Sequence, residues 1–100
     1  MEKRTPHYRL AEIQRLVVEL GAAAFTKTAL DGGRAMGLTS EEMLQVVASL
    51  TRRNFYKSMT TYADHRVWQD VYHADTPVEK QAYIKITLRW HAPVIQFKER

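Results

Sequence analysis

The sequence predicts an α+β fold in which N-terminal helices pack on one face of a C-terminal antiparallel sheet. Apolar residues recur at helical spacing in the first half of the chain, whereas apolar and polar residues alternate in the second half. The expected strands are joined by segments too short for helical crossovers, which favours antiparallel pairing. A chain of 100 residues fits a single core, so we expect one domain, residues 1–100.

The first predicted helix begins at Thr5 and Pro6, because threonine caps helices well and proline suits the first helical position. Its apolar face consists of Leu10, Ile13, Leu16, Val17 and Leu20. Gly21 can end the helix in the left-handed conformation. Residues 22–26 are expected to form a short extended link or an edge strand.

The second predicted helix has Thr28 as its cap and stops at Gly37. Gly32 and Gly33 lie inside it, and a glycine in a helix costs about 1 kcal/mol relative to alanine. We therefore expect this helix to be short or broken.

The third predicted helix has the clearest start signal, since Thr39 and Glu42 have the spacing of a capping box. Its apolar face consists of Met43, Leu44, Val46, Val47 and Leu50. Arg52 and Arg53 follow at its C-terminal end, where the helix dipole favours cations. For both arginines we favour this role at the helix end over a role in binding RNA.

Four strands are expected in the second half, at residues 55–62, 68–72, 81–89 and 94–98. The first two are rich in aromatic and β-branched residues, and the third shows the clearest alternation. The core side of the sheet would carry Ala82, Ile84, Ile86, Leu88, Ile95 and Phe97. The opposite side would carry Tyr83, Lys85, Gln96 and Lys98. Such a polar, basic and aromatic surface suits a single-stranded nucleic acid.

The composition excludes several classes of protein. The chain has no cysteine, which excludes a disulfide framework and a thiolate metal site. No apolar run follows the charged start or reaches bilayer length, so we expect no signal peptide, no membrane span and a cytoplasmic location. Residues 1–50 hold six Lys/Arg and six Asp/Glu, whereas residues 51–100 hold nine and five, which gives the second half the whole net charge of +4. A basic half indicates a polyanion or an acidic protein as partner.

Six blocks of sequence, taken together, point to one known family. They are Met-Glu-Lys-Arg-Thr-Pro-His (1–7), Phe-Tyr-Lys-Ser-Met-Thr-Thr-Tyr (55–62), Asp-His (64–65), Trp-Gln-Asp-Val-Tyr (68–72), Tyr-Ile-Lys-Ile-Thr (83–87) and Phe-Lys-Glu (97–99). In these blocks the chain resembles the motility quorum-sensing regulator (MqsR) family of bacterial toxins over nearly its full length. The glycine pair 32–33 departs from the resemblance, as does His73, which stands where a family member carries a basic residue.

The resemblance implies a RelE-like toxin fold and an endoribonuclease that cuts mRNA with a sequence preference. It implies activity without the ribosome and without a metal or other cofactor. It also implies a cognate antitoxin as partner, itself a candidate DNA-binding protein. We expect the free toxin to be monomeric. The proposed active site of the family corresponds here to Lys57, Gln69, Tyr83 and Lys98.

These residue types suit RNA cleavage without a metal. Such cleavage needs an acceptor for the 2′-hydroxyl proton, stabilisation of charge on the phosphate and a proton donor for the leaving 5′-oxygen. The two lysines can stabilise charge, Tyr83 can handle a proton, and Gln69 can only orient the substrate. We further expect the RNA to be bound by Tyr56, Tyr62, His73 and Lys85.

Histidines offer two other chemical interpretations. His65 and His73 flank the central strands and could form a histidine acid–base pair. Asp70 or Asp64 could complete a metal site with them, although the spacing matches no recognised metal motif.

The orientation of some side chains is open. Trp68, Tyr62 and Tyr72 could stack on bases or belong to the core. Strict alternation places Lys57 on the core side of its strand unless the strand twists or bulges.

Two functions other than RNA cleavage also fit the residues. The chain could be a non-catalytic nucleic-acid-binding or regulatory protein on the same scaffold, or a module that binds only proteins. The cations and aromatic residues of the expected sheet favour a nucleic acid over a protein alone. They do not distinguish cleavage from binding.

Overall fold

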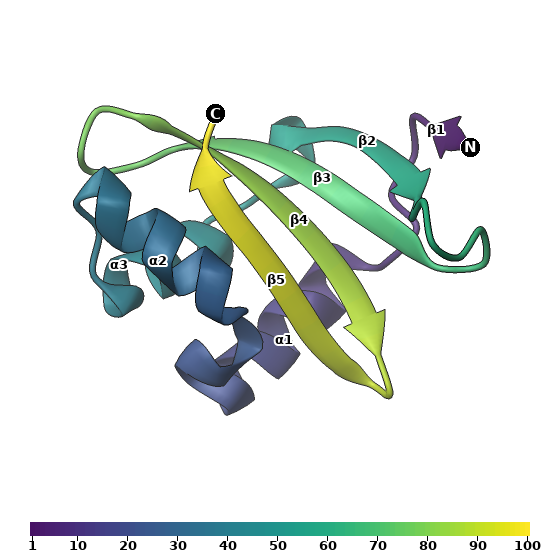
Figure 1. Ribbon diagram of the computed structural model, residues 1–100, viewed down its shortest axis with the longest axis horizontal. Coiled ribbons are helices and arrows are strands. Elements are labelled where there is room, and N and C mark those ends of the chain that lie inside the picture. The colour runs from purple at the N-terminus through teal and green to yellow at the C-terminus, as the bar shows by residue number, and fades with distance from the viewer.

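The fold is α+β, as predicted, in a computed structural model that describes residues 1–100 (Figure 1). The helices are α1 (Leu10–Leu20), α2 (Lys27–Met36) and α3 (Ser40–Ala48), with short 3₁₀ turns at Gly21–Ala24 and Arg52–Asn54. The strands are β1 (Glu2–Lys3), β2 (Phe55–Thr60), β3 (Trp68–Asp75), β4 (Gln81–Arg89) and β5 (Ala92–Glu99). They form one antiparallel sheet in the order β1-β2-β3-β4-β5. The two-residue strand β1 was not predicted.

The core lies between the helices and one face of the sheet (Figure 1). The helices contribute Ile13, Val17, Ala29, Met36, Met43, Val46 and Val47, and the strands contribute Tyr72, Ala82, Ile84, Ile86, Ile95 and Phe97. Burial of these apolar side chains is the main favourable term in folding. Tyr72 is 1% exposed, so it belongs to the core and cannot stack on bases. None of the helices has the length and apolar character needed to cross a membrane.

Helix α2 is continuous through both glycines, which the sequence did not predict. Its cap is Thr26 rather than Thr28, with the hydroxyl accepting a 3.0 Å hydrogen bond from the amide of Ala29. A Cβ atom at Gly32 would lie 2.5 Å from the carbonyl oxygen of Phe97, and one at Gly33 would overlap the side chain of Met43. Both glycines therefore allow close packing, and α2 lies against β5, the last strand of the sheet.

The first helix begins at Leu10, so the prediction of a start at Thr5 and Pro6 was wrong. The preceding backbone is held instead by Asp70, a buried carboxylate on β3. It accepts hydrogen bonds of 3.0 Å from the amide of His7 and 2.9 Å from the amide of Tyr8. A carboxylate bonded to two amides outcompetes a local capping signal, because charge-assisted hydrogen bonds are the stronger kind.

Strand β2 contains a bulge between Phe55 and Lys57. Phe55 pairs with Tyr72, whereas Lys57 pairs with Val71, so two residues of β2 oppose one residue of β3. The bulge reverses the alternation that would place Lys57 on the core side. Lys57 therefore shares the sheet face opposite the helices, called the open face below.

Candidate functional site

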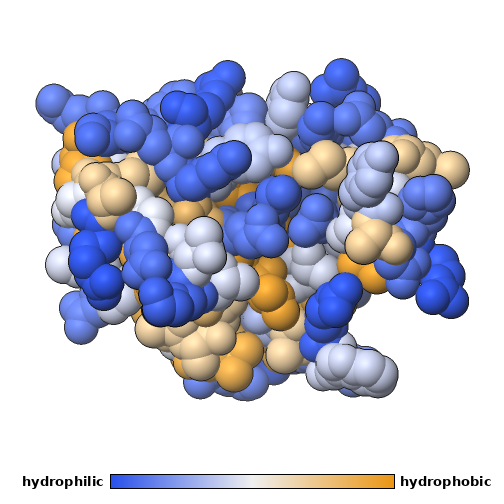
Figure 2. Space-filling model, viewed as in Figure 1, coloured by the Kyte–Doolittle hydropathy of each residue, from blue (hydrophilic) through white to orange (hydrophobic).

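All four predicted catalytic residues lie on the open face. Alternation along β3, β4 and β5 places Gln69, Tyr83 and Lys98 there, and the bulge adds Lys57 from β2. The core residues of the same strands occupy the other face. Figure 2, in the same view as Figure 1, shows hydrophilic residues over much of the visible surface, with smaller apolar patches between them.

Tyr83 and Lys98 are direct neighbours across β4 and β5. The ammonium of Lys98 lies 5.2 Å from the centre of the Tyr83 ring, within the range of a cation–π contact. A cation and a phenol hydroxyl are thus held side by side on the open face. Together they can offset charge on a phosphate and supply a proton to a nearby oxygen.

His73 extends this row on β3, where it pairs with Tyr83. The ring centres of His73 and Tyr83 are 5.5 Å apart, and the imidazole also stacks on Tyr56, with ring centres 4.5 Å apart. Burial, with a smaller contribution from the charge of Arg100, lowers the pKa of His73 below its ordinary value of 6.5. The imidazole is therefore mainly neutral at neutral pH and can accept a proton.

A second row crosses the open face through Lys57, Val71, Lys85 and Gln96, which pair in that order. Val71 is 0% exposed although it faces away from the helices, so it is covered on the open face by its neighbours. Burial, followed by the nearby charge of Lys98, lowers the pKa of Lys85. The face thus has a covered centre rather than a row of freely solvated lysines.

Lys57 is not a free cation. Its ammonium donates a 2.6 Å hydrogen bond to the carboxylate of Glu2, on β1. This hydrogen bond raises the pKa of Lys57 and lowers the pKa of Glu2. No sequence pattern indicates the contact, because β1 has only two residues and Lys57 lies 55 positions from Glu2.

A pocket of about 560 Å³ opens between α2 and the open face of β4 and β5. Its walls include Tyr83, Lys85 and Lys98, three of the residues predicted to act on or bind RNA. Helix α2 contributes Thr28, Asp31 and Gly32 to the opposite wall. Lys57 and Gln69 share the open face but lie outside this pocket.

Of the predicted RNA-binding residues, Lys85 lines the pocket. Tyr56 and His73 stack on each other on the neighbouring strands β2 and β3, and His73 pairs with Tyr83. The fourth, Tyr62, is fully exposed in the loop between β2 and β3, at the far end of β3 from His73. One face of the Trp68 indole is covered by His7, whose ring centre is 5.3 Å away. Trp68 is therefore packed within the protein on that side.

The histidine pair and the histidine–aspartate metal site are not formed. His65 precedes β3, whereas His73 lies near its end, and the five residue-to-residue steps from Trp68 to His73 span about 17 Å. Asp70 points to the core side and His73 to the open face. The structure contains no cluster of three or more His, Asp or Glu side chains suited to a metal ion.

Comparison with known proteins gives two matches. The family described as "Motility quorum-sensing regulator, toxin of MqsA" matches residues 5–99. The mRNA interferase toxin MqsR of Escherichia coli (strain K12) is 44% identical over 100 residues, which is 100% of this chain and 100% of that protein.

Proposed function

The chain belongs to the MqsR family of toxins, and we propose that it is an mRNA interferase that cuts single-stranded mRNA on the open face of its sheet. The observation that carries this proposal is the row of His73, Tyr83 and Lys98. These three residues lie on three adjacent strands, and we assign them the roles of proton acceptor, phenol and cation. The similar protein from Escherichia coli bears the name mRNA interferase.

In the proposed reaction the RNA supplies its own nucleophile. The 2′-oxygen attacks the adjacent phosphorus, the bond from phosphorus to the 5′-oxygen breaks, and the products are a 2′,3′-cyclic phosphate and a 5′-hydroxyl. The His73 imidazole takes the 2′-hydroxyl proton, and the Tyr83 hydroxyl gives a proton to the leaving 5′-oxygen. Lys98 offsets the charge that develops on the phosphate oxygens. No metal or cofactor takes part in these steps.

The remaining residues of the open face hold the substrate. Lys85 lines the pocket beside Lys98 and meets a neighbouring phosphate. The Gln69 amide, which cannot act as an acid or base, orients the RNA by hydrogen bonds. Tyr56 stacks on His73 and holds its ring in place. Lys57 contacts the RNA backbone once Glu2 releases it.

The family description names MqsA as the antitoxin. We propose that this chain is neutralised by a cognate antitoxin of that kind, and that the free toxin is a monomer. The net charge of +4, all in the half that forms the main strands, favours an acidic binding surface on the antitoxin.

The decisive experiment incubates the purified chain with a defined single-stranded RNA in the presence of a chelator. We expect cleavage, with 2′,3′-cyclic phosphate and 5′-hydroxyl ends detected by mass spectrometry. A matched RNA with a single 2′-deoxy nucleotide at the cleaved position should bind equally well but remain intact. Cleavage of that substrate at the normal rate would overturn the mechanism. Binding of both RNAs without cleavage of either would identify a non-catalytic nucleic-acid-binding protein.

A further inference from the structure

The turn between β4 and β5 consists of Trp90 and His91, both in the left-handed region of backbone space. Their φ angles are 52° and 62°, which is the signature of a two-residue type I′ turn. Such turns strongly favour Asn-Gly, because bulky side chains are disfavoured at positive φ. Tryptophan and histidine are poor choices for this turn on local grounds.

The Trp90 side chain does not compensate by packing. It is 95% exposed, and its ring makes no aromatic or cation–π contact within the protein. A large exposed indole on a strained turn adds nothing to the core. Unfavourable backbone at an exposed side chain is a feature that clusters at functional sites.

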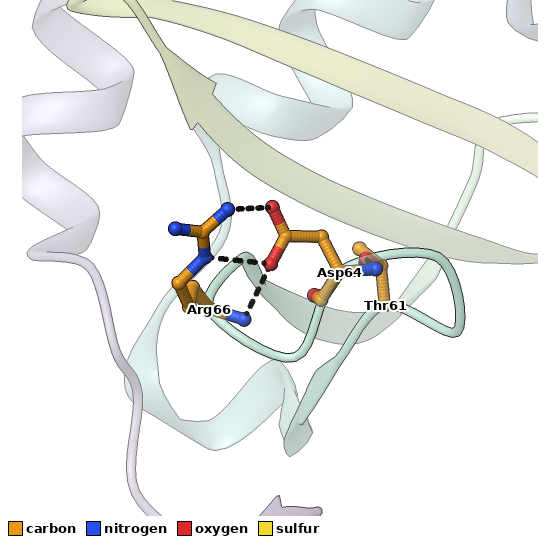
Figure 3. Close-up of polar contacts among 3 residues, drawn as sticks. All are labelled: Thr61, Asp64 and Arg66. Carbon is orange, nitrogen blue, oxygen red and sulfur yellow. Dashed lines mark hydrogen bonds and ion pairs between the residues drawn. The ribbon is translucent and has the colours of Figure 1, made fainter.

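The surroundings of Trp90 are charged, with two arginines and one aspartate. A hollow of about 450 Å³ is lined by Asp64, Arg66, Val67, Arg89 and Trp90. Asp64 forms an ion pair with Arg66, at 3.1 Å (Figure 3). The hydroxyl of Thr61 donates a hydrogen bond to the carbonyl of Asp64 and accepts one from its amide. Arg89 lines the same hollow and makes no direct ion pair with Asp64, although its charge helps to lower the pKa of that carboxylate.

The same end of the sheet carries the loop between β2 and β3, which presents the fully exposed Tyr62 (Figure 1). Arg89 lies on the open face, because it alternates with Tyr83, Lys85 and Thr87 along β4. The six residue-to-residue steps from Tyr83 to Arg89 span about 20 Å along the strand. A strand of RNA that leaves the pocket along β4 therefore reaches Arg89 and then the indole of Trp90.

We propose that Trp90, with Arg89, forms a base-stacking subsite for nucleotides that flank the cleavage position in the RNA. Exposed aromatic rings beside free cations are the usual means of binding single strands, because every base has a face that can stack. The proposal rests on the proposed function, since it extends the same RNA path. It assigns the strained turn a role in substrate binding rather than in folding.

The test is the double variant Trp90→Asn/His91→Gly, which gives the turn its preferred residues. We expect this variant to melt at a higher temperature than the original chain. Its affinity for a long, uncleavable RNA should fall about 5- to 150-fold, the effect of losing one stacked base. A matched variant, Trp90→Phe, keeps an aromatic face and should retain most of the affinity.

Two further measurements separate this proposal from the proposed function. A short RNA that reaches only the pocket and the row of His73, Tyr83 and Lys98 should be bound and cut equally by the original chain and the double variant. The long RNA should show a raised KM with an unchanged kcat in the double variant. Unchanged affinity of the double variant for the long RNA would overturn the subsite, as would a loss confined to antitoxin binding. If the original chain binds RNA without cutting it, the affinities of the original chain and the double variant for the long RNA still test the subsite.

Discussion

The carboxylate of Glu2 accepts a 2.6 Å hydrogen bond from the ammonium of Lys57, and the pair lies on the open face of the sheet. Because Lys57 is already neutralised, RNA has to compete with Glu2 for it. We predict that Glu2→Gln tightens binding of an uncleavable RNA about 2- to 5-fold, the scale of an exposed ion pair. The dependence of log affinity on log salt concentration should steepen by about 0.7, as expected for one added phosphate contact on a single strand.

Two comparisons make the Glu2 prediction specific. In a Lys57→Ala background the Glu2→Gln substitution should have no effect on the affinity for RNA, because there is no longer a lysine for which Glu2 and the RNA compete. Glu99→Gln removes the same charge from a different ion pair, with Lys80, and should leave affinity nearly unchanged. Equal gains from both glutamine variants would mean that only net charge matters.

The adjacent Tyr83 and Lys98 give a prediction for the chemical step. Tyr83→Phe and Lys98→Ala should each lower kcat about 10²- to 10³-fold, since each removes a contact made in the transition state. Both side chains point away from the core, so the melting temperature should stay within a few degrees. Lys80→Ala, which removes an exposed cation from the turn before β4, serves as the control and should keep full activity. Full activity in both site variants would refute the assigned roles.

His73 gives a prediction about pH. Burial lowers its pKa, so the imidazole becomes protonated, and unable to accept a proton, only below about pH 6.5. We predict that kcat/KM falls as pH drops through this lowered pKa, and that His73→Gln is about 10²- to 10⁴-fold slower at neutral pH with no acid limb. The same lowered pKa means that His73 contributes stability above about pH 6.5 and that this contribution is lost as pH falls.

His7 is the matched control for the pH profile. Burial lowers the pKa of His7 as well, with a smaller contribution from Lys3, but its ring stacks on Trp68 away from the pocket. His7→Gln should therefore keep the acid limb. Loss of the limb in His7→Gln, or its persistence in His73→Gln, would show that another group accepts the proton.

The two glycines of α2 give a prediction about stability. Helix propensity alone predicts that alanine at either position stabilises the protein by about 1 kcal/mol. The contacts predict the reverse for Gly32→Ala, which should destabilise by about 1–3 kcal/mol because its Cβ would meet the backbone carbonyl of Phe97. Gly33→Ala should cost less, because the obstructing atoms belong to the flexible side chain of Met43. Urea denaturation of both variants measures the change in the free energy of unfolding that each alanine causes. Equal destabilisation by the two substitutions would contradict this prediction.

The sequence predicted those features that depend on local patterns. Alternation gave the bounds of β4, and the Thr39–Glu42 capping box is present as expected. The patterns failed where a distant group decides the local structure. Asp70 holds the segment before α1, and the bulge that turns Lys57 to the open face exists only relative to β3. The Glu2–Lys57 pair joins residues on two different strands, so no periodic pattern in the sequence indicates it.

The packing of α2 against β5 also limits how another chain can join the sheet. An uncovered edge strand offers a row of free amides and carbonyls to which any extended peptide can pair. Here the outward carbonyl of Ile95 accepts the amide of Thr26 at 3.1 Å, and the carbonyl of Phe97 lies against Gly32. A foreign strand could therefore extend the sheet at β5 only by displacing α2. This edge is closed to self-association through strand pairing, and an inhibitor that acts there has to recognise side chains.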